Sequence, residues 1–135
     1  MVRSILAVIL GWVIAIIVVM VFFFGGMAAF APELMKMAPE DMTGPIESIP
    51  LLLSMLAGNI VGGIFGGFFC GLIAKQAPLK HAAILGVLFE LGFIVDGIAT
   101  WGKAPIWYFL LSAMLLLPCV VLGGWIRARQ VGSKD

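Results

Sequence analysis

Long apolar runs, separated by shorter polar segments, make up most of the chain. Four of the runs are long enough to cross the hydrocarbon core of a bilayer, which takes about 20 helical residues. They cover residues 4–24, 51–74, 82–100 and 106–126. The pattern therefore predicts an all-α fold class, an integral membrane bundle of four transmembrane helices in a single domain over residues 1–135.

The polar segments between the runs predict how the spans are connected. The longest segment, residues 32–50, is expected to form an acidic loop on the outer side of the membrane. Its acidic residues are Glu33, Glu40, Asp41 and Glu47. The connectors at residues 75–81 and 101–105 are short, so the second, third and fourth spans should form consecutive antiparallel hairpins.

Basic residues are distributed unequally between the two sides of the predicted spans. With both termini in the cytoplasm, only Lys36 and Lys103 lie on the outer side. The inner side holds Arg3, Lys75, Lys80, Arg127, Arg129 and Lys134. Because lysine and arginine favour cytoplasmic loops, we expect a multi-pass protein of the cell (inner) membrane with both termini cytoplasmic.

The ends of the spans carry features that are typical of a membrane boundary. Aromatic residues, which prefer that boundary, are expected there: Trp101, Trp107 and Tyr108 on the outer side and Trp125 on the inner side. Residues 29–31 resemble a signal cleavage site. We expect the first span to remain as an anchor, because its apolar run exceeds a signal core and Pro32 follows directly.

Composition narrows the class of protein further. Hydrophobic residues make up 63% of the chain and charged residues 11%, against roughly a quarter charged in soluble domains, which excludes a soluble globule. A net charge of +1 argues against a nucleic-acid partner. We find no glycine-rich phosphate-binding loop, no activated serine and no His/Glu pair with the spacing of metal ligands. We therefore expect neither enzymatic activity nor a cofactor nor a metal site.

Glycines in the second span form the clearest pattern in the sequence. Residues four apart share a helix face, and two rows follow this spacing: Gly58, Gly62 and Gly66, and next to them Gly63, Gly67 and Gly71. Small residues let helix backbones approach closely, which drives helix association in lipid. We expect one broad groove here and a packing role for all six glycines.

The other spans offer small residues that could dock into this groove. They are Ala7, Gly11 and Ala15 in the first span, Ala83 and Gly86 in the third, and Gly123 and Gly124 in the fourth. A homodimer seam through the same glycines is the alternative. The opposite side of the second span is expected to face lipid or a partner, through Ile60, Ile64, Phe68 and Leu72. Pro118 should kink the fourth span.

Two carboxylates lie inside the third span. Glu90 is near its midpoint, and Asp96 is about 9 Å nearer the outer surface by helical rise. Insertion scales put an acid at the span centre near +3 kcal/mol, so an intramembrane acid is a functional-site hypothesis by default. Six residues separate the two carboxylates, which places them about 120° apart around the helix and argues against paired acid–base catalysis.

Other polar side chains of the spans lie in the outer half. Asn59 and Ser112 join Glu90 and Asp96 as candidates for binding a ligand or a proton, and Asn59 is at a suitable depth to hydrogen-bond Glu90. One hypothesis gives these residues a structural role in interhelical hydrogen bonds. The other is an outward-facing pocket in which Glu90 exchanges a proton or cation for a substrate. A continuous hydrophilic path across the chain is not expected.

Three further residue types carry weaker signals. Thioethers bind Cu(I), and Met35 and Met37 could capture it, but we interpret Leu34, Met35, Met37 and Met42 as an interfacial segment. His81 has no metal-ligating partners and is interpreted as an interfacial anchor. Cys70 and Cys119 should behave as small hydrophobes.

Two stretches carry a family resemblance. Residues 3–8 and 77–82, read with the acidic loop and the glycine-rich span, resemble short four-span bacterial inner-membrane proteins, and this likeness implies no particular activity. The chain is similar to the small multidrug resistance transporters in size and span count only. Those carry an essential glutamate in the first span, where this chain has no charge after Arg3, so their activity is not carried over.

The sequence thus favours a non-enzymatic membrane protein acting through helix packing, as a subunit, stabiliser or assembly factor. Its partners would be the lipid bilayer and other membrane-protein subunits or a second copy. The alternative is a small oligomeric transporter that is proton- or cation-coupled through Glu90, with Asn59 and Asp96 lining the approach. A third hypothesis is ligand or metal capture by the outer loop.

Overall fold

Each apolar run forms one long α-helix in the computed structural model, which describes residues 2–38, 44–74 and 77–132. The helices are α1 (Val2–Phe30), α2 (Ile49–Ala74), α3 (Pro78–Ala99) and α4 (Ile106–Gly132), with a short 3-10 turn, η1 (Leu34–Lys36). These described ranges contain no β-strand. All four helices are long and apolar enough to cross a membrane, which confirms the predicted fold class.

Prolines mark the helix ends. α1 ends at Phe30, shortly before Pro32, because a residue that precedes proline is disfavoured in a helix. α2 and α3 carry Pro50 and Pro78 in their first turns, where the missing N–H would have no helical acceptor. α1 and α4 extend beyond the predicted residues 24 and 126, because a helix can continue past the apolar run until its sequence stops it.

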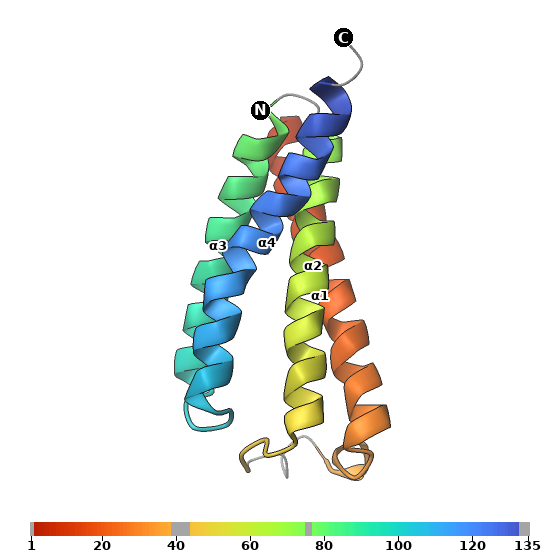
Figure 1. Cartoon of the computed structure of the whole chain (residues 1–135), viewed down its shortest axis with the longest axis vertical. Helices are drawn as coiled ribbons and strands as arrows, with labels where there is room; N and C mark the ends of the chain where they lie inside the picture. Colours follow the sequence, from red (N-terminus) through yellow and green to blue (C-terminus); the bar gives the residue numbers. More distant parts are fainter. Residues whose placement is uncertain (1, 39–43, 75–76, 133–135) are drawn as a thin grey trace.

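The four helices form two hairpins that lie closest at one end (Figure 1). Among the described residues, α2 contacts α1, α3 and α4, whereas α1 has few contacts with α3 and none with α4. We call the end with both chain termini the termini end, and the other, with residues 31–38, 44–48 and 100–105, the loop end. From the termini end to the loop end, the α1–α2 hairpin diverges from the α3–α4 hairpin.

The first glycine row of α2 packs against α1. A Cβ atom added to Gly66 would lie 2.8 Å from Ala15 Cβ, and one added to Gly62 would lie 3.0 Å from the Ala15 carbonyl oxygen. Gly11 is equally close to α2, since its Cβ would lie 2.8 Å from the Gly66 carbonyl oxygen. Ala7 and Ala15 are fully buried. Small residues of α1 therefore lie directly against the first glycine row.

The second glycine row packs against α4, so the prediction of one broad groove is wrong. A Cβ atom on Gly67 would collide with the Val120 carbonyl group, and one on Gly63 would lie 3.2 Å from Cys119 Cβ. Consecutive residues such as Gly62 and Gly63 are 100° apart around a helix. The two rows therefore face different neighbours, α1 and α4.

The small residues of α3 and α4 have separate partners. Gly123 meets the backbone of α2 at Ile64, as the docking prediction expected of the fourth span. Gly124 lies between two helices: it meets Ala82 of α3, and its backbone nitrogen would lie 3.2 Å from a Cβ on Gly67 of α2. Gly86 faces α4, with its Cβ position 3.5 Å from Leu117, so the prediction that it docks on the glycines of α2 is wrong. α4 stands between most of α3 and those glycines.

The predicted lipid-facing side of α2 is narrower than expected. Ile60, Ile64 and Phe68 are half-buried, and Ile60 packs beside Leu52, Leu56 and Tyr108. Leu72 is exposed, as are Leu53 and Phe65. Helices on two sides of α2 leave only a thin strip of it uncovered. Pro118, the predicted site of a kink, lies within the continuous helix α4.

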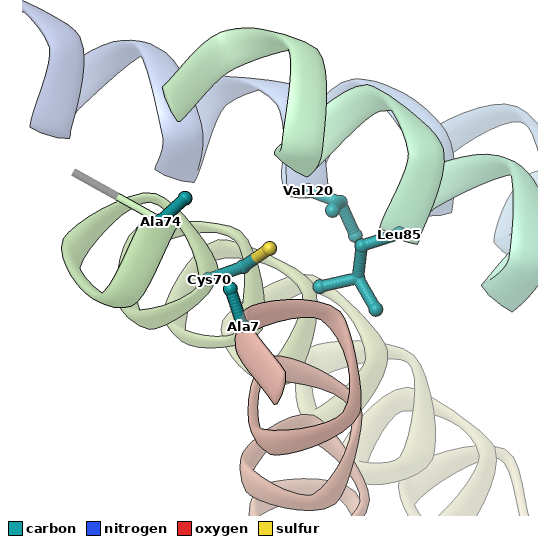
Figure 2. Packing of buried hydrophobic residues seen from close by; sticks show 5 residues of the cluster. All are labelled: Ala7, Cys70, Ala74, Leu85 and Val120. Carbon is teal, nitrogen blue, oxygen red and sulfur yellow. The ribbon is translucent and has the colours of Figure 1, made fainter. Parts of the chain in front are cut away.

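Two hydrophobic clusters stabilise the bundle. The cluster at the termini end joins all four helices through Ala7, Cys70, Ala74, Leu85 and Val120 (Figure 2). The cluster nearer the loop end consists of Leu52, Leu56 and Tyr108. Cys70 and Cys119 are buried free thiols.

Candidate functional site

Three polar side chains form a buried network between α2 and α4. The Asn59 side-chain nitrogen Nδ2 donates to Tyr108 Oη and to Ser112 Oγ, each over 3.4 Å. Tyr108 and Ser112 are four residues apart, so they share one face of α4 and can both meet one amide from α2. Asn59 and Ser112, both candidates from the sequence, are therefore in direct contact.

Tyr108 is the residue of this network that the sequence did not indicate as a site candidate. It is a predicted boundary aromatic in the first turn of α4, and its side chain is 5% exposed and packs beside Leu52 and Leu56. Trp101 and Trp107 remain exposed at the same end of the bundle. Two features of the sequence could have indicated that Tyr108 belongs to the network: it is four residues from Ser112, and Asn59 lies at a matching depth.

The expected hydrogen bond between Asn59 and Glu90 is not formed, because Asn59 donates to α4 instead. Within the described part of the chain, the buried Glu90 atom Oε2 has no hydrogen-bond partner. Glu90 shares a face of α3 with Gly86 and Gly97. These glycines lie against Leu117 and Phe109 of α4, so Glu90 lies along the contact between α3 and α4.

A pocket of about 490 Å³ lies between α1 and α3, with α2 and α4 behind it. Phe89, Phe93 and Asp96 line it from α3, while Glu90 does not contribute. Asn59 and Tyr108 are the other lining residues whose side chains carry oxygen atoms. Of the four polar candidates, the structure thus brings Asn59, Ser112 and Asp96 to one region and leaves Glu90 on another face.

Asp96 lies one turn from the end of α3. The Thr100 hydroxyl donates to the Asp96 backbone oxygen over 2.7 Å, and the Thr100 N–H donates to the same oxygen. These bonds close the last turn of α3 and leave the Asp96 carboxylate exposed. The carboxylate is therefore available to a ligand at the loop end of the pocket.

Basic side chains gather at the termini end. The Arg3 side chain donates from Nε to the Ile73 carbonyl oxygen over 3.0 Å, which ties the start of α1 to the end of α2. The Arg129 guanidinium lies 3.9 Å from the centre of the Trp125 ring. Lys75 and Lys134, which the orientation prediction also used, are outside the described residues, as are Glu40, Asp41 and Met42 of the loop.

The loop carries two exposed methionines near a second pocket. Met35 and Met37 are 52% and 45% exposed. Met37 lines the second pocket, of about 560 Å³, together with Met27 and Lys103. Within residues 2–38, 44–74 and 77–132, no group of three His, Cys, Asp or Glu side chains could hold a metal ion. His81 Nδ1 lies 3.0 Å from the Ala77 carbonyl oxygen.

These features define the class of the molecule: a multi-pass integral membrane protein with four helices and a pocket between its two hairpins. Comparisons with protein-family models, with curated proteins and with solved structures give no match to the chain.

Proposed function

We propose that this protein is a non-enzymatic membrane protein that acts through helix packing, as a subunit, stabiliser or assembly factor of a membrane complex. The observation that carries the proposal is the Glu90 carboxyl. Its Oε2 atom is buried and lacks a hydrogen-bond partner among the residues described. By helical rise Glu90 lies about 18 Å from Pro78 and about 14 Å from Ala99, close to the middle of the membrane.

The position of Glu90 on α3 supports a partner from outside the chain. Phe89 and Phe93 line the pocket between α1 and α3, and Glu90 is turned about 100° from Phe89 toward the exposed side of the helix. Its neighbours on that side are the exposed side chains of Val87 and Ile94. Glu90 itself is half-buried at the edge of the contact between α3 and α4, so a helix that packs along this side of α3 would reach the carboxyl group beside its buried Oε2 atom.

The energetics also favour such a partner. An acid at the centre of a span costs about 3 kcal/mol on insertion scales, and this cost falls when the acid finds a donor or acceptor. An interhelical hydrogen bond in a membrane contributes about 0.6 kcal/mol on average and about 1.7 kcal/mol at most. A polar side chain on a partner helix would therefore stabilise the complex and specify its register.

The proposal keeps both termini in the cytoplasm of a bacterial cell. Arg3, Lys80, Arg127 and Arg129 all lie at the termini end, which supports this orientation through the preference of basic residues for the cytoplasmic side. In that orientation the polar network and the Asp96 end of the pocket lie in the outer half of the membrane.

Co-purification in mild detergent tests the proposed function. The tagged protein should elute with a foreign membrane protein in fixed stoichiometry, measured by native mass spectrometry. Glu90→Gln keeps a hydrogen-bonding group and should retain the partner, whereas Glu90→Leu should reduce its recovery about ten-fold, which corresponds to about 1.4 kcal/mol.

The matched control is Asp96→Leu, which removes the other carboxyl of α3 and should retain the partner. Full recovery of the partner with Glu90→Leu would overturn the role of Glu90. A wild-type protein that elutes without any foreign partner would overturn the subunit role itself.

The alternative function is a small oligomeric transporter that is proton- or cation-coupled through Glu90. One observation favours it, since Asn59 and Asp96 line a common pocket. Glu90 lies outside that lining, so the subunit role has the stronger support. The transporter hypothesis predicts a clean homo-oligomer and the loss of proton-coupled uptake by proteoliposomes that contain Glu90→Gln.

A further inference from the structure

The pocket between α1 and α3 changes in character along its length. At the end nearer the loops it is lined by Asp96 and Tyr108, and deeper in the bundle by Trp12, Phe89 and Leu116. Phe89 and Asp96 are seven residues apart on α3, which corresponds to about 10 Å. The pocket is therefore amphipathic, with a carboxylate at one end and an apolar interior.

Aromatic rings from three helices form much of the lining. Trp12 and Phe23 come from α1, Phe89 and Phe93 from α3, and Tyr108 from α4. The Trp12 and Phe89 rings pack edge to face, with centroids 6.5 Å apart, and connect α1 to α3 at the deep end. The faces of such rings attract cations through their quadrupole, in addition to the apolar contact that they provide.

The charge of the lining favours a cation as well. Asp96 is the carboxylate of this pocket, and the lining contains no lysine, arginine or histidine. In the described ranges of the chain, the ion pair with N···O within 4 Å is that of Lys36 with Glu33, so Asp96 has no such counter-ion. A carboxylate beside aromatic rings, without a basic neighbour in the lining, is complementary to an organic cation.

We propose that this pocket binds a small lipophilic organic cation. The charged head would lie at Asp96, and the apolar body would extend inward against Phe93, Phe89 and Trp12. A volume of about 490 Å³ lies within the range of small-molecule sites, roughly 300–1,000 Å³. An acyl chain of a lipid would fill the apolar part but would leave Asp96 without a partner.

The site is independent of the proposed subunit function. Glu90, which carries that function, is on a different face of α3 from the lining residues Phe89, Phe93 and Asp96. Substitutions of Glu90 and of Asp96 therefore test the two proposals separately.

Two probes of the same shape and opposite charge provide the test. The purified full chain in lipid nanodiscs should bind tetraphenylphosphonium saturably, at one site per chain, in equilibrium dialysis against empty nanodiscs. Tetraphenylborate should show no saturable binding. Asp96→Asn should weaken phosphonium binding about ten-fold or more, the effect expected when a charged partner is lost.

Two further variants keep the test decisive. Glu90→Gln is the matched control, because it neutralises the other carboxylate of α3 and should leave phosphonium affinity unchanged. Gly92→Leu should block the pocket without disturbing the fold, since a Cβ at Gly92 meets no atom within 4 Å and Gly92 lines the pocket. The thermal unfolding of each variant is measured alongside.

Three results would overturn the proposal. They are the absence of saturable phosphonium binding to the wild-type chain, equal binding of tetraphenylborate, and unchanged affinity in a folded Asp96→Asn or Gly92→Leu variant. Equal binding of both probes would identify the pocket as a site for apolar groups such as acyl chains. None of these results would alter the recovery of a partner in the Glu90 experiment.

Discussion

The contact between α2 and α4 is built differently at its two ends. At the termini end, backbone lies against backbone: Gly67 meets the Val120 carbonyl, and Gly123 meets the Ile64 carbonyl. Nearer the loop end, side chains separate the same two helices, with Asn59 bonded to Tyr108 and Ser112. The distance between packed helices depends on the side chains at their contact. This difference accounts for the divergence of the two hairpins in Figure 1.

The divergence has a consequence on the opposite side of the bundle. Within each hairpin the two helices pack side by side, α3 beside α4 and α1 beside α2. Separation of α2 from α4 therefore also separates α1 from α3. The pocket lies between α1 and α3, and its lining extends from Trp12 at the deep end to Asp96. Close packing of small residues at one end and larger side chains at the other thus produces a site without any break in a helix.

We expect the largest change in the free energy of unfolding when a side chain is added where α2 and α4 pack most closely, near the termini end. Gly67→Ala places a Cβ against the Val120 carbonyl group, which is backbone and cannot rotate away. We expect a loss of about 3 kcal/mol in the free energy of unfolding, the upper part of the usual range for overpacking. Unfolding by SDS in mixed micelles, followed by circular dichroism, measures this change.

Gly25→Ala is the matched control for that substitution. Gly25 lies in α1, and a Cβ there meets no atom within 4 Å. Its free energy of unfolding should not fall. If Gly67→Ala is as stable as Gly25→Ala, the backbone contact between α2 and α4 is not the junction of the two hairpins.

The second prediction concerns the stability that the polar network provides nearer the loop end. Asn59→Ala removes the hydrogen bonds to Tyr108 and Ser112. At about 0.6 kcal/mol for each bond, we expect a loss of about 1.2 kcal/mol, measured by the same unfolding titration. A double-mutant cycle with Ser112→Ala should give a coupling energy of about 0.6 kcal/mol. If the losses from the two single substitutions simply add in the double variant, the hydrogen bond between Asn59 and Ser112 is excluded.

The membrane spans and the small packing residues could be predicted because both depend on local sequence. Apolar runs of sufficient length determine the helices, and the four-residue spacing of Gly58, Gly62 and Gly66 determines a face. The same four-residue spacing of Ala7, Gly11 and Ala15 predicted that these residues pack against the glycines, since small residues on two helices permit close approach.

The order of the helices around the bundle could not be derived in this way. The depth of each residue follows from its position along the span, but its neighbour depends on which helix lies beside it. Asn59 is near Glu90 in depth, yet α4 rather than α3 presents the side chains that it contacts. The same limitation explains Gly86, which faces α4 instead of the glycines of α2.

The smallest expected change in the free energy of unfolding has the opposite sign to that of Gly67→Ala. Gly92 lies in the loop-end half of α3, where it lines the pocket and a Cβ meets no atom within 4 Å. Glycine within a helix is less favourable than alanine by roughly 0.5–1 kcal/mol, so Gly92→Ala should raise the free energy of unfolding by about 0.5 kcal/mol. The change from glycine to alanine would then destabilise the protein at Gly67, near the termini end, and stabilise it at Gly92, in the loop-end half of α3. A loss of stability for Gly92→Ala comparable to that for Gly67→Ala would mean that α1 and α3 are closely packed along their whole length, and that the pocket does not exist in the membrane.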